Sequence, residues 1–307
     1  MDKIINYLGL KNDNMSLTSN DQLIKINSLL NNLNYELGIE DKIKVPTLVT
    51  IGSQSSGKST LINRILKLNI IPMGSVMETR TPLNIELIHT EKEYYVEFGE
   101  YVNFEWKLIK RIDINNDENE SPHLNEIKHK IKFLTNKYAG DQMGISSKEI
   151  NIKLYSPFVS NLNFVDLPGL TMIACTDKGQ PKDIKNQIRD LLIKYIKPEN
   201  NLILCVMPAR EDLETDIALE LVKQYDIEGN RTIGVLTKID LMNRGNNVEN
   251  YLTGNISKDL SLKYGYYAIK NRNKQEMETM NIFEGIKAEE SYFKNTNPYK
   301  NLSSEAN

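Results

Sequence analysis

Apolar runs of strand length alternate with amphipathic stretches of helix length through the second half of the chain. The strand-like runs are LNFVD, NLILCVM, RTIGVLT and GYYAIKN, and the helix-like stretches include DIKNQIRDLLIKYI, LETDIALELVKQY and NVENYLTGNISKDL. Strands that alternate with helices in this way favour a mostly parallel sheet with helices on both faces. The pattern therefore predicts an α/β fold.

The first half of the chain shows the same two periodicities less regularly. A strand-like run at residues 45–51 precedes a glycine-rich turn, and a helix-like run follows at residues 61–68. Further strand is expected in LNIELIHT and in YYVEFGEYVNFEWKLI, and a helix is expected in HLNEIKHKIKFLTNKY. The segment NNDENESPH is polar and charged, which predicts a solvated loop.

The N-terminal region divides into two parts. Residues 1–20 are polar and are expected to be a flexible N-terminus, whereas residues 21–40 have the apolar spacing of a helix, with Asp21 as its N-cap. The apolar positions of this helix are Leu23, Ile26, Leu30, Leu33 and Leu37. Spacing alone leaves two interpretations equally open, a helix packed on the domain and a helix shared with a partner segment.

Composition and charge narrow the class of protein. The chain has 307 residues, 40% hydrophobic and 26% charged, with a formal net charge of -3, which is ordinary for a globular protein. A negative net charge argues against a nucleic-acid partner bound through bulk positive charge. The start of the chain lacks a long apolar core, and no apolar run reaches the roughly 20 residues of a membrane-spanning helix. The predicted location is therefore the cytoplasm.

Cys175 and Cys205 lack metal-ligand or redox spacing, and Cys205 is expected to be a buried thiol.

The turn GSQSSGKS, residues 52–59, fits the phosphate-loop pattern and has the strand and helix that the pattern requires on either side. Gly52 and Gly57 allow the tight turn that points backbone N–H groups at phosphate oxygens. Lys58 can reach the β- and γ-phosphates, and Ser59 can hold Mg²⁺. The loop predicts a nucleotide site, to which Ser53, Ser56 and Thr60 also belong.

The segment FVDLPG follows a second apolar strand. Asp166 ends that strand and is placed to bind Mg²⁺, directly or through a water, and Gly169 is placed to offer its backbone N–H to the γ-phosphate. Taken alone, the segment is equally typical of an ordinary turn that leaves a strand. Its place after a phosphate loop favours the metal-binding interpretation.

The segment TKID decides which base is bound. Asp240 can accept hydrogen bonds from the N1–H and 2-amino groups of guanine, and adenine has neither donor. Lys238 can lay its aliphatic stem along the base, and Thr237 belongs to the same site. The order of the three motifs predicts a GTPase. An ATP-using phosphate-loop enzyme is the alternative, and competition between GTP and ATP distinguishes the two.

These motifs together resemble the dynamin superfamily of large GTPases, from about Leu23 to about Leu302. The likeness includes Gln54 and Ser55 in the phosphate loop, and PMGSVMETRTP resembles the family's first switch. It implies a phosphate-loop GTPase fold in which a bundle-signalling-type helix, residues 21–40, packs at one side. Residues 41–300 would then form the GTPase domain, and residues 301–307 would begin a truncated or missing downstream segment.

The resemblance also implies residue roles. Thr79 would bind Mg²⁺ and, with Gln54, position the attacking water. Asn271 and Arg272 would contact the guanine and the ribose. Ser55 would bind a monovalent cation, K⁺ or Na⁺, together with carbonyls of the first switch that belong to Gly74 and Val76. Arg80, the nearest arginine in the first switch, would be the next candidate if no cation binds.

The resemblance further implies partners and a physiological role. G domains of the family pair through their nucleotide faces as homodimers, and the family serves membrane remodelling, by fission or fusion, as assemblies at a membrane periphery. Two positions depart from the family pattern, Val76 in place of a glycine and Gly179 where an acidic residue commonly precedes QP. They keep open a nucleotide-gated scaffold that binds GTP with little hydrolysis.

Overall fold

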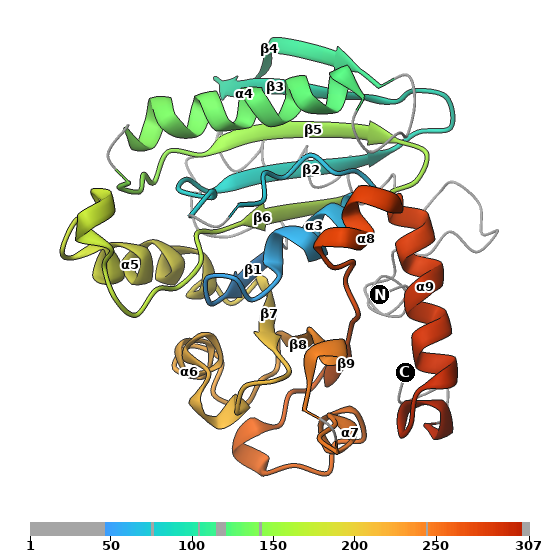
Figure 1. Cartoon of the computed structure of the whole chain (residues 1–307). Coiled ribbons are helices and arrows are strands. Elements are labelled where there is room, and N and C mark those ends of the chain that lie inside the picture. The colour runs from blue at the N-terminus through green and yellow to red at the C-terminus, as the bar shows by residue number, and fades with distance from the viewer. Residues whose placement is uncertain are drawn as a thin grey trace.

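The computed structural model describes residues 47–74, 77–103, 105–114, 121–140, 143–243 and 245–302. Within these ranges nine strands form one sheet, in the order β4-β3-β5-β2-β6-β1-β7-β8-β9 (Figure 1). The strands are β1 (Leu48–Gly52), β2 (Leu83–His89), β3 (Tyr95–Val102), β4 (Glu105–Asp113), β5 (Ile150–Ser156), β6 (Leu162–Asp166), β7 (Leu202–Pro208), β8 (Thr232–Thr237) and β9 (Tyr266–Ala268). The predicted flexible segment and helix, residues 1–40, lie outside the described residues.

The pairing directions confirm a mostly parallel sheet. Strand β1 runs parallel to both of its neighbours, β6 and β7, and the pairs β7–β8, β8–β9 and β2–β5 are also parallel. The antiparallel pairs are β2–β6, β3–β4 and β3–β5. Strand β1 lies in the interior of the sheet, and all five of its residues are buried, as expected of a strand covered on both faces.

Helices cover both faces of the sheet, as the alternating pattern predicts. The helices are α3 (Lys58–Leu66), α4 (Pro122–Ala139), α5 (Ile184–Ile196), α6 (Ile217–Lys223), α7 (Glu249–Leu252), α8 (Lys274–Thr279) and α9 (Ile282–Asn295). Apolar residues of α3 and α4 form one buried cluster with the sheet, and those of α5 and α6 form another. Strand β7 shows the division, since Leu204 and Val206 join the first cluster whereas Ile203, Cys205 and Met207 join the second. Cys205 is the buried free thiol that its apolar context predicts.

One predicted helix differs from the structure. The stretch NVENYLTGNISKDL, which has helical spacing, holds only α7 and a single 3-10 turn, Lys258–Leu260. Gly254 lies between them at φ +74°, which is a left-handed conformation that an α-helix does not contain. The strand expected in YYVEFGEYVNFEWKLI is present as β3 and the start of β4. Between them lies Asn103, whose φ is 51°.

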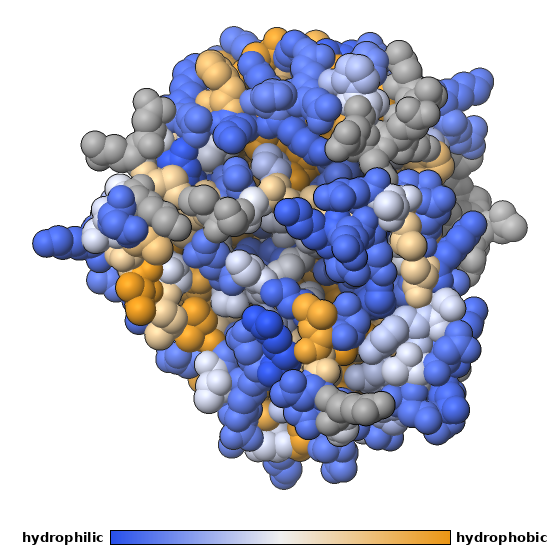
Figure 2. Space-filling view, in the orientation of Figure 1, coloured by the Kyte–Doolittle hydropathy of each residue, from blue (hydrophilic) through white to orange (hydrophobic). Residues whose placement is uncertain are grey.

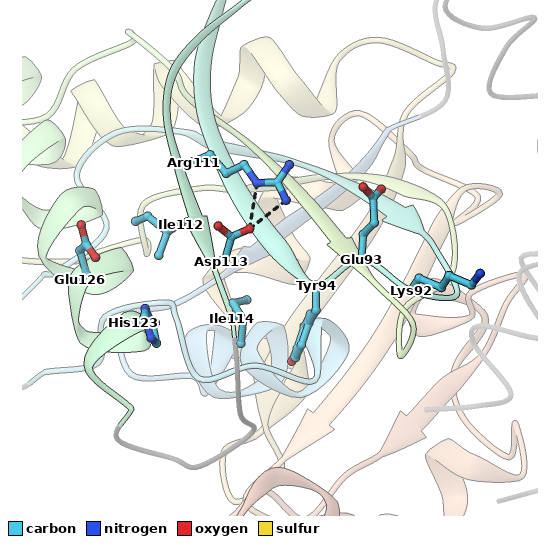
Figure 3. A pocket seen from close by; sticks show the side chains of 9 residues that line it. All are labelled: Lys92, Glu93, Tyr94, Arg111, Ile112, Asp113, Ile114, His123 and Glu126. Atoms are coloured by element: carbon cyan, nitrogen blue, oxygen red, sulfur yellow. Dashed lines mark hydrogen bonds and ion pairs between the residues drawn. The ribbon is translucent and has the colours of Figure 1, made fainter.

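The surface visible in Figure 2 is mainly hydrophilic, with small separate apolar areas among the coloured residues. Among the described residues, no helix combines the length and apolar character needed to cross a membrane. A hollow of about 620 Å³ opens at the β4 edge, lined by the residues just before β3, the end of β4 and the start of α4 (Figure 3). Four strands separate β4 from β1 in the sheet, so this hollow is not part of the phosphate-loop region.

Candidate nucleotide-binding site

The phosphate loop leaves β1 and enters α3, and its backbone has the turn that the glycine spacing predicts. Gly57 has φ 96° and Ser55 has φ 64°, and the Gly57 carbonyl accepts the first helical hydrogen bond from Leu61 N at 3.0 Å. A Cβ on Gly52 would lie 2.4 Å from the backbone carbonyl oxygen of Val206 in β7. The close contact with β7 therefore requires glycine at the start of the loop.

Lys58 places a buried positive charge within this loop. Its Nζ donates to the carbonyl oxygens of Gly52 at 3.1 Å and Ser53 at 3.2 Å. Burial lowers the pKa of Lys58, and the nearby Asp166 carboxylate acts in the opposite direction. A cation with so little contact with water attracts an anion more strongly than an exposed one does. The side chain is thus suited to bind phosphate oxygens.

Asp166 lies at the end of β6 and is fully buried. Thr79 donates from Oγ1 to Asp166 Oδ2 at 3.2 Å, and Thr50 donates from Oγ1 to Asp166 Oδ1 at 3.3 Å. Burial raises the pKa of Asp166 to about 6, and the Lys58 ammonium opposes this shift. The structure thus brings together two of the three predicted magnesium ligands, Thr79 and Asp166. The third, Ser59, lies in the first turn of α3.

The donor chemistry of these residues fits Mg²⁺. The ion prefers hard oxygen ligands, typically one or two carboxylates together with substrate phosphates and waters. Here the oxygens are two hydroxyls and one buried carboxylate, which lacks the hydration it has in water. A divalent cation would offset that cost of burial.

The segment after β6 packs directly on the phosphate loop. Leu170 donates to Gly52 O at 3.0 Å and accepts from Gln54 N at 2.8 Å. A Cβ on Gly169 would lie 3.0 Å from both Gln54 Cα and Lys58 Nζ. Glycine at this position lets the second motif approach the first. Gln54 and Ser55 themselves are exposed at the tip of the loop.

The TKID segment contacts the phosphate loop through one buried side chain. Thr237 donates from Oγ1 to Ser56 O at 2.5 Å. Lys238 follows at φ 58°, and burial lowers its pKa. Asp240 lies half-buried in the 3-10 turn Ile239–Leu241. The first residue of the TKID motif, Thr237, therefore contacts the phosphate loop directly.

Asn271 and Arg272 lie in the loop after β9. They line a common cleft with Thr60 of α3, so the loop lies beside the helix that follows the phosphate loop. The Asn271 Oδ1 atom is buried and has no hydrogen-bond partner within the described structure, which leaves it able to accept from a ligand. Arg272 donates from Nη1 to Met280 O at 2.7 Å.

A sequence profile of the dynamin family matches residues 48–239, and a profile of the dynamin central region matches residues 247–307. The chain belongs to the dynamin family. It is 39% identical over 287 residues to Dynamin-A of Dictyostelium discoideum, an alignment that covers 92% of this chain and 32% of that protein. It is 35% identical over 283 residues to Dynamin of Drosophila melanogaster, covering 92% of this chain and 30% of that protein. The chain thus spans about a third of the length of these relatives.

Membership of the dynamin family supports the GTPase class that the three motifs predict. It also agrees with the observed fold, in which a phosphate loop follows the central strand of a large α/β sheet. The dynamin-family resemblance further predicted a monovalent-cation site at Ser55, Gly74 and Val76. Gly74 is exposed, and Val76 lies outside the described residues, so this site stays a prediction.

Arg80, the alternative cation of the first switch, is bonded elsewhere. Its guanidinium donates to Gly140 O at 2.8 Å, to Gly144 O at 3.3 Å and to Asn136 Oδ1 at 2.6 Å. The side chain is buried, and its hydrogen bonds connect the segment after Thr79 to the end of α4. In this dynamin-family chain Arg80 therefore has a structural role, and the expectation that it could supply positive charge at the phosphates is not supported.

Two site residues have no local sequence signal. Thr50 lies in the middle of β1, where a buried threonine looks like any strand residue, and yet it holds the Asp166 carboxylate. Glu289 lies 17 residues after Arg272 and contacts the backbone of the base-side loop. Contacts between residues so distant in the chain depend on the fold, and the spacing of the motifs does not predict them.

Proposed function

We propose that the chain is a magnesium-dependent GTPase that hydrolyses GTP to GDP and phosphate. The observation that carries this proposal is the buried Lys58 ammonium, held within the phosphate loop beside the Thr79–Asp166 hydrogen bond. Phosphoryl transfer depends on positioning and on neutralising charge more than on covalent chemistry by the protein. A buried cation and oxygen ligands for Mg²⁺ meet these needs.

The side chains have distinct tasks in this scheme. Lys58 binds the β- and γ-phosphate oxygens, and the loop N–H groups stabilise the charge that develops between them. Ser59, Thr79 and Asp166 would hold Mg²⁺, which when bound supplies further neutralisation of phosphate charge. Gln54 lies exposed at the loop tip, where it and Thr79 orient the attacking water.

In this proposal Asp240 selects guanine. Its carboxylate accepts from N1–H and the 2-amino group, and Lys238 covers the face of the base. An adenine base would leave the carboxylate without donors, which is the kind of loss that gives large discrimination. Asn271 Oδ1, buried and without a hydrogen-bond partner in the described structure, offers a further acceptor on the base side. Arg272 lies next to it and contacts the ribose.

We also propose that activity depends on pairing of two G domains through their nucleotide faces. Met172 and Ile173 follow Leu170, which contacts the phosphate loop, after one intervening residue, and they are 56% and 78% exposed. Apolar side chains so exposed beside the phosphate loop are suited to contact a second copy. Membrane remodelling is the proposed role of the whole protein, through regions beyond those described.

A monovalent cation completes the proposed charge neutralisation. Ser55 would bind K⁺ or Na⁺ with carbonyls of Gly74 and Val76. Hydrolysis is then expected to require one of these ions and to increase in Val76→Gly, because a valine resists the positive φ that a glycine adopts freely. Equal rates in potassium and in a large organic cation would exclude this feature and leave the rest of the proposal intact.

Substitution of Lys58 tests the proposed hydrolysis. Lys58→Ala is expected to lower GTP turnover by a factor on the order of 100 or more, since one charged contact to the transferred group is lost. Phosphate release is the readout, and Lys185→Ala, an exposed lysine of α5, is the matched control. Wild-type turnover in Lys58→Ala would refute the assignment. Binding of GTP by the wild type without turnover would instead favour the nucleotide-gated scaffold.

A further inference from the structure

Glu289 is a carboxylate in the middle of α9 with 6% of its surface exposed. One of its oxygens, Oε2, pairs with Nη2 of Arg64 in α3. The other, Oε1, accepts from the backbone N–H of Lys270 at 2.9 Å. Both oxygens are therefore used, and each bond goes to a different element of the fold.

The two partners of Glu289 belong to elements that carry different parts of the proposed site. Arg64 is six residues after Lys58, in the helix that carries the phosphate side of the site. Lys270 directly precedes Asn271 and Arg272, on the base side. Arg64, Lys270, Asn271 and Arg272 line one cleft. The Glu289 carboxylate thus connects the two halves of the site through a helix that lies outside every motif.

Other contacts hold the same loop without replacing this one. Ile269 N donates to Leu236 O at 2.8 Å, which continues the sheet pairing beyond β9. The Lys270 side chain pairs with Glu276 of α8 at 2.9 Å. A Cβ on Gly285 of α9 would lie 2.5 Å from Arg272 Cγ, so α9 also packs closely on Arg272. Glu289 alone, among these contacts, joins the Lys270 backbone to α3.

We propose that Glu289 is a positioning residue for guanine recognition, which rests on the GTPase function proposed above. Its carboxylate fixes the Lys270 backbone relative to α3 and so sets where Asn271 and Arg272 meet the base and ribose. Arg64 orients the carboxylate as its ion-pair partner, and removing either partner alone would leave the other buried without its counter-charge. Loss of the contact to Lys270 weakens nucleotide binding more than it slows the chemical step.

Two double variants separate the ion pair from the contact to the loop. Arg64→Glu with Glu289→Arg restores opposite charges, but an arginine has no acceptor for the Lys270 N–H. Arg64→Met with Glu289→Gln removes both charges and retains an amide oxygen that can accept it. Glu290→Gln, at an exposed position of the same helix, is the matched control. Each variant is assayed for the KM and kcat of GTP hydrolysis, for GDP affinity and for the urea midpoint of unfolding.

The charge-swapped protein is expected to show a KM and a GDP dissociation constant raised about 10-fold or more, the effect of one lost hydrogen bond to a buried group. Its kcat should change less than its KM. The neutral pair is expected to stay within about 3-fold of the wild type in both binding constants, well below that loss. The KM and the GDP dissociation constant of Glu289→Gln alone should lie between those of the two double variants. This single variant replaces the charge-swapped protein in the comparison if that protein does not fold.

Equal effects of the two double variants on GDP affinity, or binding losses that follow the urea midpoint, would overturn the proposal and leave Glu289 a stability residue. That result would leave the GTPase assignment standing, because wild-type turnover and the Lys58→Ala loss do not depend on Glu289. Failure of the wild type to bind guanine nucleotide would overturn both.

Discussion

In the proposed site Asp240 and Lys58 contact opposite ends of the nucleotide, so substitutions of the two residues should have different effects. Asp240→Asn is expected to lower affinity for GTP on the order of 100-fold, because the new amide presents a donor to the N1–H and 2-amino groups. Xanthosine triphosphate should gain affinity, since its 2-oxo group accepts from that amide. Competitive displacement of labelled GDP measures both, with Asp190→Asn, exposed on α5, as control. Unchanged preference would mean that another residue reads the base.

Individual residues differ in how far the sequence could predict them. Lys58, Asp166 and Asp240 belong to contiguous motifs whose spacing follows from a strand, a turn and a helix, whereas the hydrogen bond between Thr79 and Asp166 was not predicted. Thr50 and Glu289 act through partners 116 and 19 residues away, respectively. Their roles depend on the packing of elements, for which the chain carries no local signal.

Helix α4 provides a test of the fold that leaves the nucleotide site untouched. Ser121 is its N-cap, and its Oγ accepts from Leu124 N at 3.3 Å. Ser121→Ala is expected to lower the free energy of unfolding by about 1 kcal/mol without changing GTP turnover. Urea denaturation measures this change. Ser257→Ala removes the corresponding cap of a single 3-10 turn and should cost less. An unchanged free energy of unfolding in Ser121→Ala would show that α4 does not depend on its cap.

At the scale of elements, continuous apolar runs were the most predictable. LNFVD coincides with β6, and NLILCVM and RTIGVLT lie within one residue of β7 and β8 at each end. Strand β5 was not identified, although its sequence INIKLYS has the alternation of a half-covered strand. Its half-buried positions include Lys153, which pairs with Glu86 of the neighbouring β2. Helices α8 and α9 were also missed, although both begin with capping boxes at Asn273 and Asn281.

At the scale of the whole molecule, the proposed pairing of G domains predicts a nucleotide-dependent dimer. Met172 and Ile173 are exposed in the single chain. They should become buried between two copies when the bound nucleotide mimics the transition state. Sedimentation with GDP and aluminium fluoride is therefore expected to give a dimer, and Ile173→Asp should shift it towards monomer at equal protein concentration. Ile227→Asp, at a similarly exposed position, is the control. A monomer in every nucleotide state at tens of micromolar protein would contradict pairing.

The central claim is hydrolysis of GTP, and phosphate release over a range of protein concentrations tests it most directly. With magnesium and potassium present, the account predicts release from GTP that excess ATP does not inhibit and a rate that rises faster than linearly with protein. The Lys58→Ala protein in the same assay sets the background. No release above that background at any concentration, or equal inhibition by ATP, would contradict the account.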